Sequence, residues 1–212
     1  MSDMAVMIFY AYLFAGMVIS YFIGNINPAI ILGKIYGVDI RKEGSGNAGT
    51  TNVLRTLGKK AGVITLIIDI AKGFIPTFIL INFIQDIFST MLFGICIIVG
   101  HMWPVVFHFK GGKGVATTFG VLLAARPLLA VILLGIVALG ILITRRMSVG
   151  VLIAVLLAVP ISYFLFHEYI IWISVSVIAI LVLIKHKDNI KRIFKGEEPK
   201  ISFGNKARKG EK

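Results

Sequence analysis

The chain has 212 residues, of which 58% are hydrophobic and only 15% charged, and its mean hydropathy is +0.93. Soluble domains carry about a quarter of charged residues, so this composition excludes a soluble globular protein and predicts an integral membrane protein. The formal net charge of +12 suits nucleic acid, anionic lipid or an acidic substrate. Cys96 is the only cysteine, so the chain forms no internal disulfide, and no Cys/His cluster predicts a metal site.

Seven apolar segments follow one another along the chain. They cover residues 6–23, 61–83, 88–106, 115–125, 128–143, 149–166 and 170–184. A helix needs about 20 apolar residues to cross a bilayer, so the fourth segment is too short to span upright and should begin inside the protein. We therefore expect an all-α protein with seven transmembrane helices. Residues 1–200 should form one domain, and residues 201–212 a basic, disordered cytoplasmic tail.

The placement of positive charge predicts the orientation. Apart from Lys72 and Arg126, all 22 lysines and arginines lie after the first, third, fifth and seventh segments. Basic loops stay on the cytoplasmic side, which places the N-terminus outside and the C-terminus in the cytoplasm. The positive charge is thus a topology signal, and we expect no nucleic-acid partner.

A polar, glycine-rich stretch over residues 43–52 separates the first two segments. Glycine reaches backbone angles that other residues avoid, so such a run can curl its N–H groups around an anion, most often a phosphate. The alternative is a flexible surface turn. The candidate binding residues are Ser45, Gly46, Asn47, Gly49, Thr51, Asn52 and Arg55.

A second cluster, residues 109–118, opens the fourth segment. A glycine turn entering a helix presents free N–H groups and the positive end of the helix dipole, and Lys113 adds a full charge. The pattern fails as a P-loop, because Phe107 stands where the first glycine belongs and Gly114 replaces the Ser/Thr. A basic loop with a helix cap is the alternative to a phosphate site. The candidates here are Gly112, Lys113, Gly114 and Thr117.

The third cluster, residues 186–198, continues from the seventh segment. Asn189 and Arg192 share a face if this stretch is helical, and an arginine can hold phosphate through two hydrogen bonds. His186 is a candidate general base. The alternative is an ordinary basic tail on anionic lipid.

Other polar residues lie close to these clusters. Asp69 and Lys72 fall within the second segment, where charged groups should pair and face the bundle interior. Ser148 begins the sixth segment and either caps its helix or contacts a ligand. His101 lies near the cytoplasmic end of the third segment, where packing is its default role. Three polar clusters on one face exceed the needs of one phosphate, which indicates two anionic substrates or one with two anionic groups, one of them a lipid.

The motifs resemble those of a known family. Residues 45–53, residues 111–117, and Asn189 and Arg192 with Gly196 and Glu198 are similar, in order, to the three motifs of the bacterial membrane-bound acyl-phosphate:glycerol-3-phosphate acyltransferases. Residues 69–73 and 100–104 also resemble stretches of that family. Thr50 departs from the alanine usual there.

The resemblance implies a reaction and a place. A fatty acyl group would pass from acyl phosphate to the 1-hydroxyl of glycerol-3-phosphate, giving lysophosphatidic acid and inorganic phosphate in the first acylation of phospholipid biosynthesis. It implies no cofactor, a multi-pass protein of the bacterial plasma membrane with a cytoplasmic site, and membrane lipids as partners. The sequence leaves the oligomeric state open and is compatible with a monomer.

The resemblance also implies roles for the residues. Ser45, Asn47, Lys113 and His186 would form the catalytic group. The other candidates named above, together with Ser148, Gly196 and Glu198, would bind substrate. The acyl-phosphate head group would contact Ser45, Gly46, Asn47, Thr51 and Ser148, and glycerol-3-phosphate would contact Arg55, Lys113, Asn189 and Arg192. Backbone N–H groups of residues 46–47 or 112–114 would stabilise the oxyanion. We expect a donor phosphate oxygen, rather than His186, to take the proton.

Three other functions compete with this one. A transporter of a phosphorylated solute would account for Asp69 and Lys72 inside the bilayer, but the sequence shows no inverted repeat. An alcohol phosphotransferase would carry paired aspartates for metal, which this chain lacks. A non-catalytic binder of anionic lipid would need only the basic tail.

Overall fold

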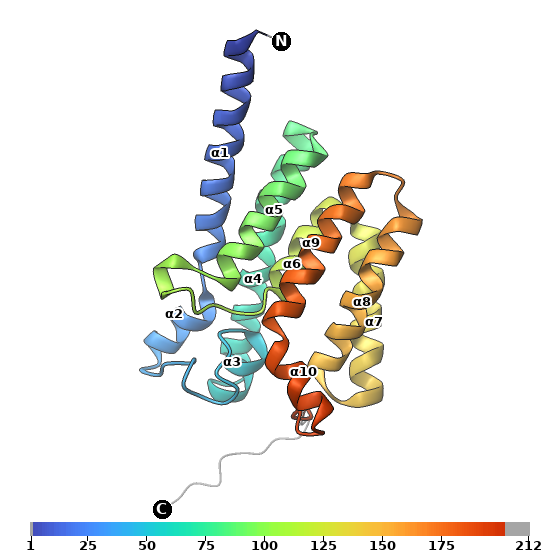
Figure 1. Cartoon of the computed structure of the whole chain (residues 1–212). Helices are drawn as coiled ribbons and strands as arrows, with labels where there is room; N and C mark the ends of the chain where they lie inside the picture. The colour runs from blue at the N-terminus through green and yellow to red at the C-terminus, as the bar shows by residue number, and fades with distance from the viewer. Residues whose placement is uncertain (1, 202–212) are drawn as a thin grey trace, which may run out of the picture.

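The computed structural model describes residues 2–201, and all the regular structure in that part of the chain is helical, which confirms the predicted all-α class. The helices are α1 (Asp3–Asn25), α2 (Pro28–Ile35), α3 (Thr50–Thr56), α4 (Lys59–Ile79), α5 (Ile87–Met102), α6 (Val115–Ala125), α7 (Pro127–Thr144), α8 (Met147–Leu165), α9 (Tyr169–Lys185) and α10 (Lys187–Phe194), with a π-helical turn η1 (Leu80–Ile84) and a short 3₁₀ turn η2 (Val105–Phe107). They form the upright bundle of Figure 1. The predicted tail lies outside the described residues, except for Ile201.

The apolar segments form the long helices of the bundle. Within the described residues, five helical stretches are long and apolar enough to cross a membrane, and the bent pair of α9 and α10 makes a sixth. The fourth apolar segment is α6, an 11-residue helix with the predicted bounds. The count of seven spans and their orientation stay predictions.

Three short helices were not predicted from the sequence: α2, α3 and α10. Helix α2 begins where Asn27 accepts a hydrogen bond from the Ile30 N–H group at 3.1 Å, with Pro28 at the first helical position. The loop that we predicted over residues 43–52 ends at Gly49, whose backbone is extended, and residues 50–52 form the start of α3. Both helices contribute to a small apolar cluster that includes Ala29 and Val53. Helices this short depend on such packing, which a local sequence pattern does not reveal.

Two pairs of helices in the bundle approach each other closely at glycine residues. A Cβ atom on Gly100 of α5 would lie 2.1 Å from the carbonyl oxygen of Tyr21 in α1, and one on Gly73 of α4 would lie 2.3 Å from the carbonyl oxygen of Thr117 in α6. Only glycine permits these approaches, a usual device of membrane helices. They bring α1 against α5 and α4 against α6.

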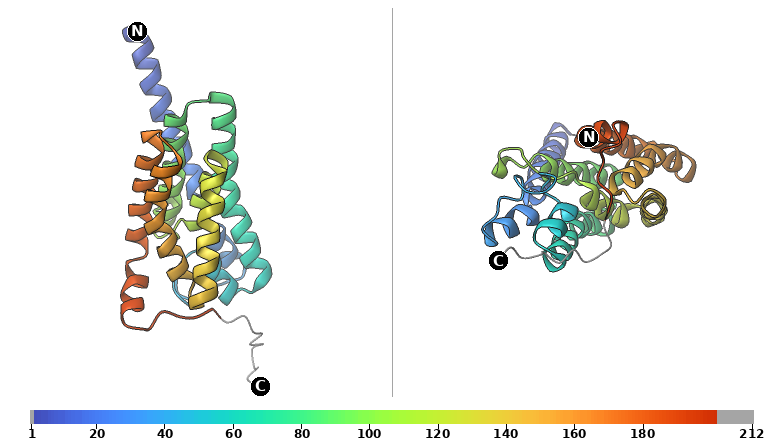
Figure 2. Two further views of the ribbon diagram at one scale, coloured as in Figure 1. Left: turned by 90° about the vertical axis from the view of Figure 1, so that its right-hand side faces the viewer. Right: turned by 90° about the horizontal axis from the view of Figure 1, so that it is seen from below.

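The polar segments gather at one end of the bundle. Helices α2, α3 and α10 lie at the end opposite the N-terminus of α1 (Figures 1 and 2). Many large apolar side chains on the outward faces of the long helices are exposed, among them Phe14, Leu142 and Phe164. A lipid environment would cover such surfaces. The fold therefore combines a helix bundle that is apolar on its outer surface with one polar end.

Candidate functional site

A cavity of about 390 Å³ lies between the three polar motifs. The predicted site residues in its lining are Ser45, Gly46, Asn47, Lys113, Asn189 and Arg192. These residues are up to 147 positions apart in sequence (45 to 192), and the bundle brings them to one space. Arg41, Lys110, Lys185, Lys187 and Asp188 also line it and were not assigned to the site from sequence, although each lies close to a motif. The lining carries far more positive than negative charge, which suits anions.

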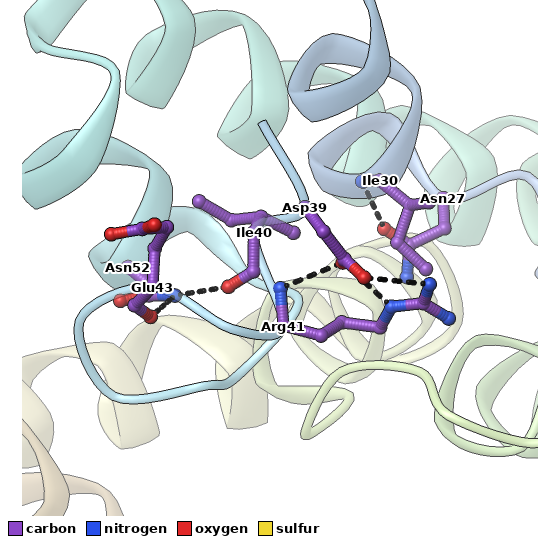
Figure 3. Close-up of polar contacts among 7 residues, drawn as sticks. All are labelled: Asn27, Ile30, Asp39, Ile40, Arg41, Glu43 and Asn52. Carbon is purple, nitrogen blue, oxygen red and sulfur yellow. Dashed lines mark hydrogen bonds and ion pairs between the residues drawn. The ribbon is translucent and has the colours of Figure 1, made fainter. Parts of the chain in front are cut away.

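Hydrogen bonds from the Asn52 side chain hold the loop of the first motif in place (Figure 3). The side-chain amide of Asn52 donates to the carbonyl oxygens of Ile40 and Glu43, each at 2.9 Å, and its Oδ1 accepts from the Ser45 N–H group at 2.9 Å. Asn52 is buried and does not line the cavity. It therefore holds the loop that presents Ser45 and Asn47.

The Asp39 carboxylate orients Arg41 at the edge of the same loop (Figure 3). The guanidinium Nε and one terminal nitrogen donate to the two carboxylate oxygens at 2.9 and 3.1 Å. Hydrogen bonds from Arg41 hold the pKa of Asp39 below its usual value. The pair thus fixes the position of Arg41 in the cavity lining.

The remaining first-motif candidates lie away from the cavity lining. Gly49 precedes α3, Thr51 is half-buried in its first turn, and Arg55 is exposed in its last turn. The structure does not bring these three to the cavity with Ser45 and Asn47.

The second motif packs tightly against α5. The Gly112 N–H group donates to the His101 carbonyl oxygen at 3.2 Å. A Cβ atom on Gly112 would lie 2.3 Å from His101 Nε2, so no larger residue fits. Gly114, with φ of +78°, precedes α6, and Thr117 is buried one turn later.

The structure leaves fewer backbone groups for an oxyanion than the sequence suggested. The Gly112 N–H group bonds to His101, and the Gly46 N–H group donates to the Glu43 carbonyl oxygen at 2.9 Å. The prediction that these two N–H groups face a substrate is therefore wrong, because a local turn occupies the N–H group of Gly46 and a contact with α5 occupies that of Gly112.

Lys113 lies at the centre of the arrangement. Its ammonium group donates to Asn189 Oδ1, which joins the second motif to the third. Burial lowers the pKa of Lys113 to about 8, and nearby Arg192 contributes in the same direction, against the opposing effect of Glu198. Lys113 is thus a partly desolvated cation whose charge acts strongly on a neighbouring anion.

Glu198 ties the third motif together. Helix α10 turns by 62° from α9, and Gly196, with φ of +73°, reverses the chain. Glu198 then accepts hydrogen bonds from Ser148 at 2.6 Å, Asn189 at 2.6 Å and Arg192 at 2.8 Å. Burial alone would raise the pKa of Glu198, but these three hydrogen bonds hold it below its usual value. Ser148, Gly196 and Glu198 therefore position the lining residues and do not line the cavity themselves.

His186 lies at the junction of α9 and α10 and does not line the cavity. It is buried, and its Nδ1 donates to the Val182 carbonyl oxygen at 2.8 Å. Burial, and then the nearby charge of Lys113, lower the pKa of His186 to about 4. The imidazole is neutral at pH 7 and a weak base.

A buried polar cluster adjoins the site and was only partly predicted. The expected Asp69–Lys72 pair is confirmed, with Lys72 Nζ 2.8 Å from Asp69 Oδ1 and both side chains buried. His101 belongs to the same cluster, with its Nδ1 2.7 Å from Lys72 Nζ. The prediction that His101 serves only in packing is wrong, because residues far apart in sequence meet there.

A second cavity, of about 120 Å³, lies between α6, α7, α8 and α9. Apart from Thr118, every residue in its lining is apolar. It begins at Val115, two residues after Lys113, and at Val182, three residues before Lys185. An apolar space thus starts next to the cationic one.

Comparison with known proteins identifies the family. The family model described as glycerol-3-phosphate acyltransferase matches residues 14–196. The chain belongs to this family. Among curated members of the glycerol-3-phosphate acyltransferase family, it is 39% identical to one from Staphylococcus carnosus over 88% of this chain and 96% of that one. It is 41% identical to one from Alkaliphilus metalliredigens over 86% of this chain and 92% of that one.

Solved structures of the acyltransferase family have the same fold. The crystal structure of PlsY (YgiH), an integral membrane glycerol 3-phosphate acyltransferase, in its glycerol 3-phosphate form aligns with a TM-score of 0.85 at 35% identity, over 90% of this chain and 96% of that one. Its lysophosphatidic acid form aligns with a TM-score of 0.83 at 34% identity over the same shares. The fold is therefore that of an integral membrane acyltransferase, and the recognition from motifs is confirmed.

Proposed function

We propose that this acyltransferase acylates the 1-hydroxyl of glycerol-3-phosphate with acyl phosphate as the donor, giving lysophosphatidic acid and inorganic phosphate. This would be the first acylation step of phospholipid biosynthesis. The acceptor follows from family membership. The observation that carries the proposal is the cationic cavity around Lys113 with the apolar cavity beginning two residues away. A fatty acyl phosphate has a matching anionic head and an apolar chain.

The polar lining divides naturally between two anions. Ser45, Gly46 and Asn47 on one side would hold the acyl-phosphate head group, and Lys113, Asn189 and Arg192 on the other would hold glycerol-3-phosphate. Both groups line the same cavity. The acyl carbonyl would then lie near the acceptor hydroxyl, and such positioning supplies much of the rate enhancement in a two-substrate reaction.

The proposed reaction is a direct displacement. The acceptor hydroxyl oxygen bonds to the acyl carbon, the bond from that carbon to the phosphate oxygen breaks, and the proton passes to the departing phosphate. Acyl phosphate is a mixed anhydride with a good leaving group, so no acyl-enzyme is needed. The Lys113 ammonium stabilises the charge that develops on the oxyanion and the phosphate.

We propose the bacterial plasma membrane as the location, with the site facing the cytoplasm and residues 1–200 forming one domain with seven spans. The cavity-lining cations Arg41, Lys110 and Lys187 support this orientation, because basic residues favour the cytoplasmic side. Reporter fusions at each end of the chain test it. A cytoplasmic N-terminus would contradict it.

The proposed function is tested by which acyl donor the protein uses. Purified protein is given glycerol-3-phosphate with either acyl phosphate or acyl-CoA, and released phosphate and lysophosphatidic acid are measured. We expect product with acyl phosphate alone. Product with acyl-CoA alone would refute the donor, and product with neither would refute the reaction.

We expect His186→Ala to keep activity within about tenfold of the wild type, because a true general base contributes roughly 10²–10⁴-fold and His186 does not line the cavity. Steady-state kinetics in detergent check this. His167→Ala is the matched control, since His167 is exposed between α8 and α9. Complete loss of turnover in folded His186→Ala protein would make His186 the proton acceptor.

We expect glycerol-3-phosphate binding to weaken as the pH rises through about 8, where Lys113 loses its proton. The phosphate ester itself is fully ionised well below this pH, since its second pKa is about 6. Binding is measured by calorimetry between about pH 7 and pH 9.5. Lys113→Arg keeps its charge over this range, so it should abolish the pH dependence. An unchanged profile in that variant would assign the titration to another group.

A further inference from the structure

Asp69, Lys72 and His101 form a buried cluster that does not line either cavity. Besides its contacts with Asp69 at 2.8 Å and His101 at 2.7 Å, Lys72 Nζ donates to the Ile26 carbonyl oxygen at 2.6 Å. With Lys72 as an ammonium group, which has donors and no acceptor, the 2.7 Å contact makes His101 Nδ1 an acceptor. Asp69 Oδ1 lies 3.3 Å from the same ring nitrogen, so His101 contacts both members of the pair. Lys72 thus contacts one carboxylate, one ring nitrogen and one carbonyl oxygen, and the single acid neutralises the single ammonium group.

His101 contacts the second motif through both its main chain and its ring. Its carbonyl oxygen accepts a hydrogen bond from the Gly112 N–H group at 3.2 Å. Its ring nitrogen Nε2 lies so close to Gly112 that a side chain at position 112 would collide with it. The same Cβ position on Gly112 would lie 2.6 Å from the Ala48 carbonyl oxygen, so Gly112 also approaches the first motif. Gly112 is thus held between α5 and the first motif, one residue before Lys113.

We infer that Asp69, Lys72 and His101 are positioning residues for anion binding by Lys113. Lys72 fixes the His101 ring, the ring and carbonyl of His101 fix Gly112, and Gly112 sets where the Lys113 ammonium enters the cavity. The cluster joins the end of α1 to α4, α5 and the second motif, so it sets the relative position of all four. The identity of the anion as glycerol-3-phosphate rests on the proposed function.

The double variant Asp69→Leu/Lys72→Met tests this without leaving a buried charge unpaired. Replacing a buried ion pair by apolar residues of similar size is often tolerated, so the protein should fold. We expect its Kd and its KM for glycerol-3-phosphate to rise about tenfold, since a displacement of about 1 Å is costly at such a site. Loss of folded protein alone would lower kcat with KM and Kd unchanged, and that result would overturn the inference.

A pair of substitutions at His101 separates positioning from packing. His101→Asn keeps an acceptor near the place of Nδ1, and His101→Leu fills the space without one. We expect His101→Asn to bind glycerol-3-phosphate nearly as the wild type does, and His101→Leu to bind as weakly as the double variant. Equal binding by both would overturn the inference. Cys96→Ala, a half-buried change on the same helix, is the control.

Calorimetric binding needs no acyl donor, so it separates this inference from the proposed function. Wild-type protein that binds glycerol-3-phosphate without acylating it refutes the proposed reaction, while the variants still decide the inference. Wild-type protein that does not bind glycerol-3-phosphate overturns both.

Discussion

Lys113→Ala should lower kcat/KM for acyl transfer about 1,000-fold, near the upper end of the effect of removing one preorganised charge-stabilising donor. Lys113 lines the cavity, is half-buried, and bridges two motifs through Asn189. Its charge therefore acts in a poorly solvated space, where a cation stabilises a developing anion far better than in water. The measurement is phosphate release over a range of both substrates.

The control for this substitution is Lys42→Ala. Lys42 belongs to the first-motif region, is exposed and does not line the cavity, so activity should be almost unchanged. Thermal unfolding in detergent shows whether each variant remains folded. Folded Lys113→Ala protein with more than about a tenth of wild-type activity would contradict a role in transition-state stabilisation.

Glu198→Ala should lower kcat/KM about 100-fold, because it frees Asn189 and Arg192 from the geometry in which they face the cavity. Glu198 accepts from both of these and from Ser148. The substitution leaves three donors without their acceptor, so the unfolding temperature should also fall. Kinetics and thermal unfolding measure the two effects on the same samples.

A graded series at this position tests the explanation. Ser148→Ala removes a single donor and should cost less than about tenfold. Glu198→Gln keeps one oxygen acceptor and should lie between Ser148→Ala and Glu198→Ala. An equal or larger loss in Ser148→Ala would instead mean that Ser148 contacts substrate directly.

The pH dependence of stability provides a second test of Glu198. Its pKa is lower in the folded protein than its ordinary value, so its ionised form stabilises the fold above that ordinary value. This contribution is lost as the pH falls through the folded pKa. The difference in unfolding temperature between wild type and Glu198→Gln should therefore shrink on acidification. A difference that stays constant would point to shape rather than charge.

The sequence determined the class of protein and the contents of the site. Apolar segments of bilayer length require helices, because lipid offers no partners to backbone polar groups. The predicted bounds of α6 match those observed. The residue types of the three polar motifs indicated anion binding, and six of the predicted site residues line one cavity.

Only the tertiary structure decided which polar groups face that cavity. Asn52, Ser148 and Glu198 looked like binding residues, yet their side chains hold other parts of the site. His101 looked like a packing residue and proved to join Lys72 to Gly112. A sequence pattern states which hydrogen-bonding groups are present, but their partners are set by contacts between segments up to 84 residues apart in the chain. For that reason chemistry could be predicted from the sequence, and the direction in which each side chain points could not.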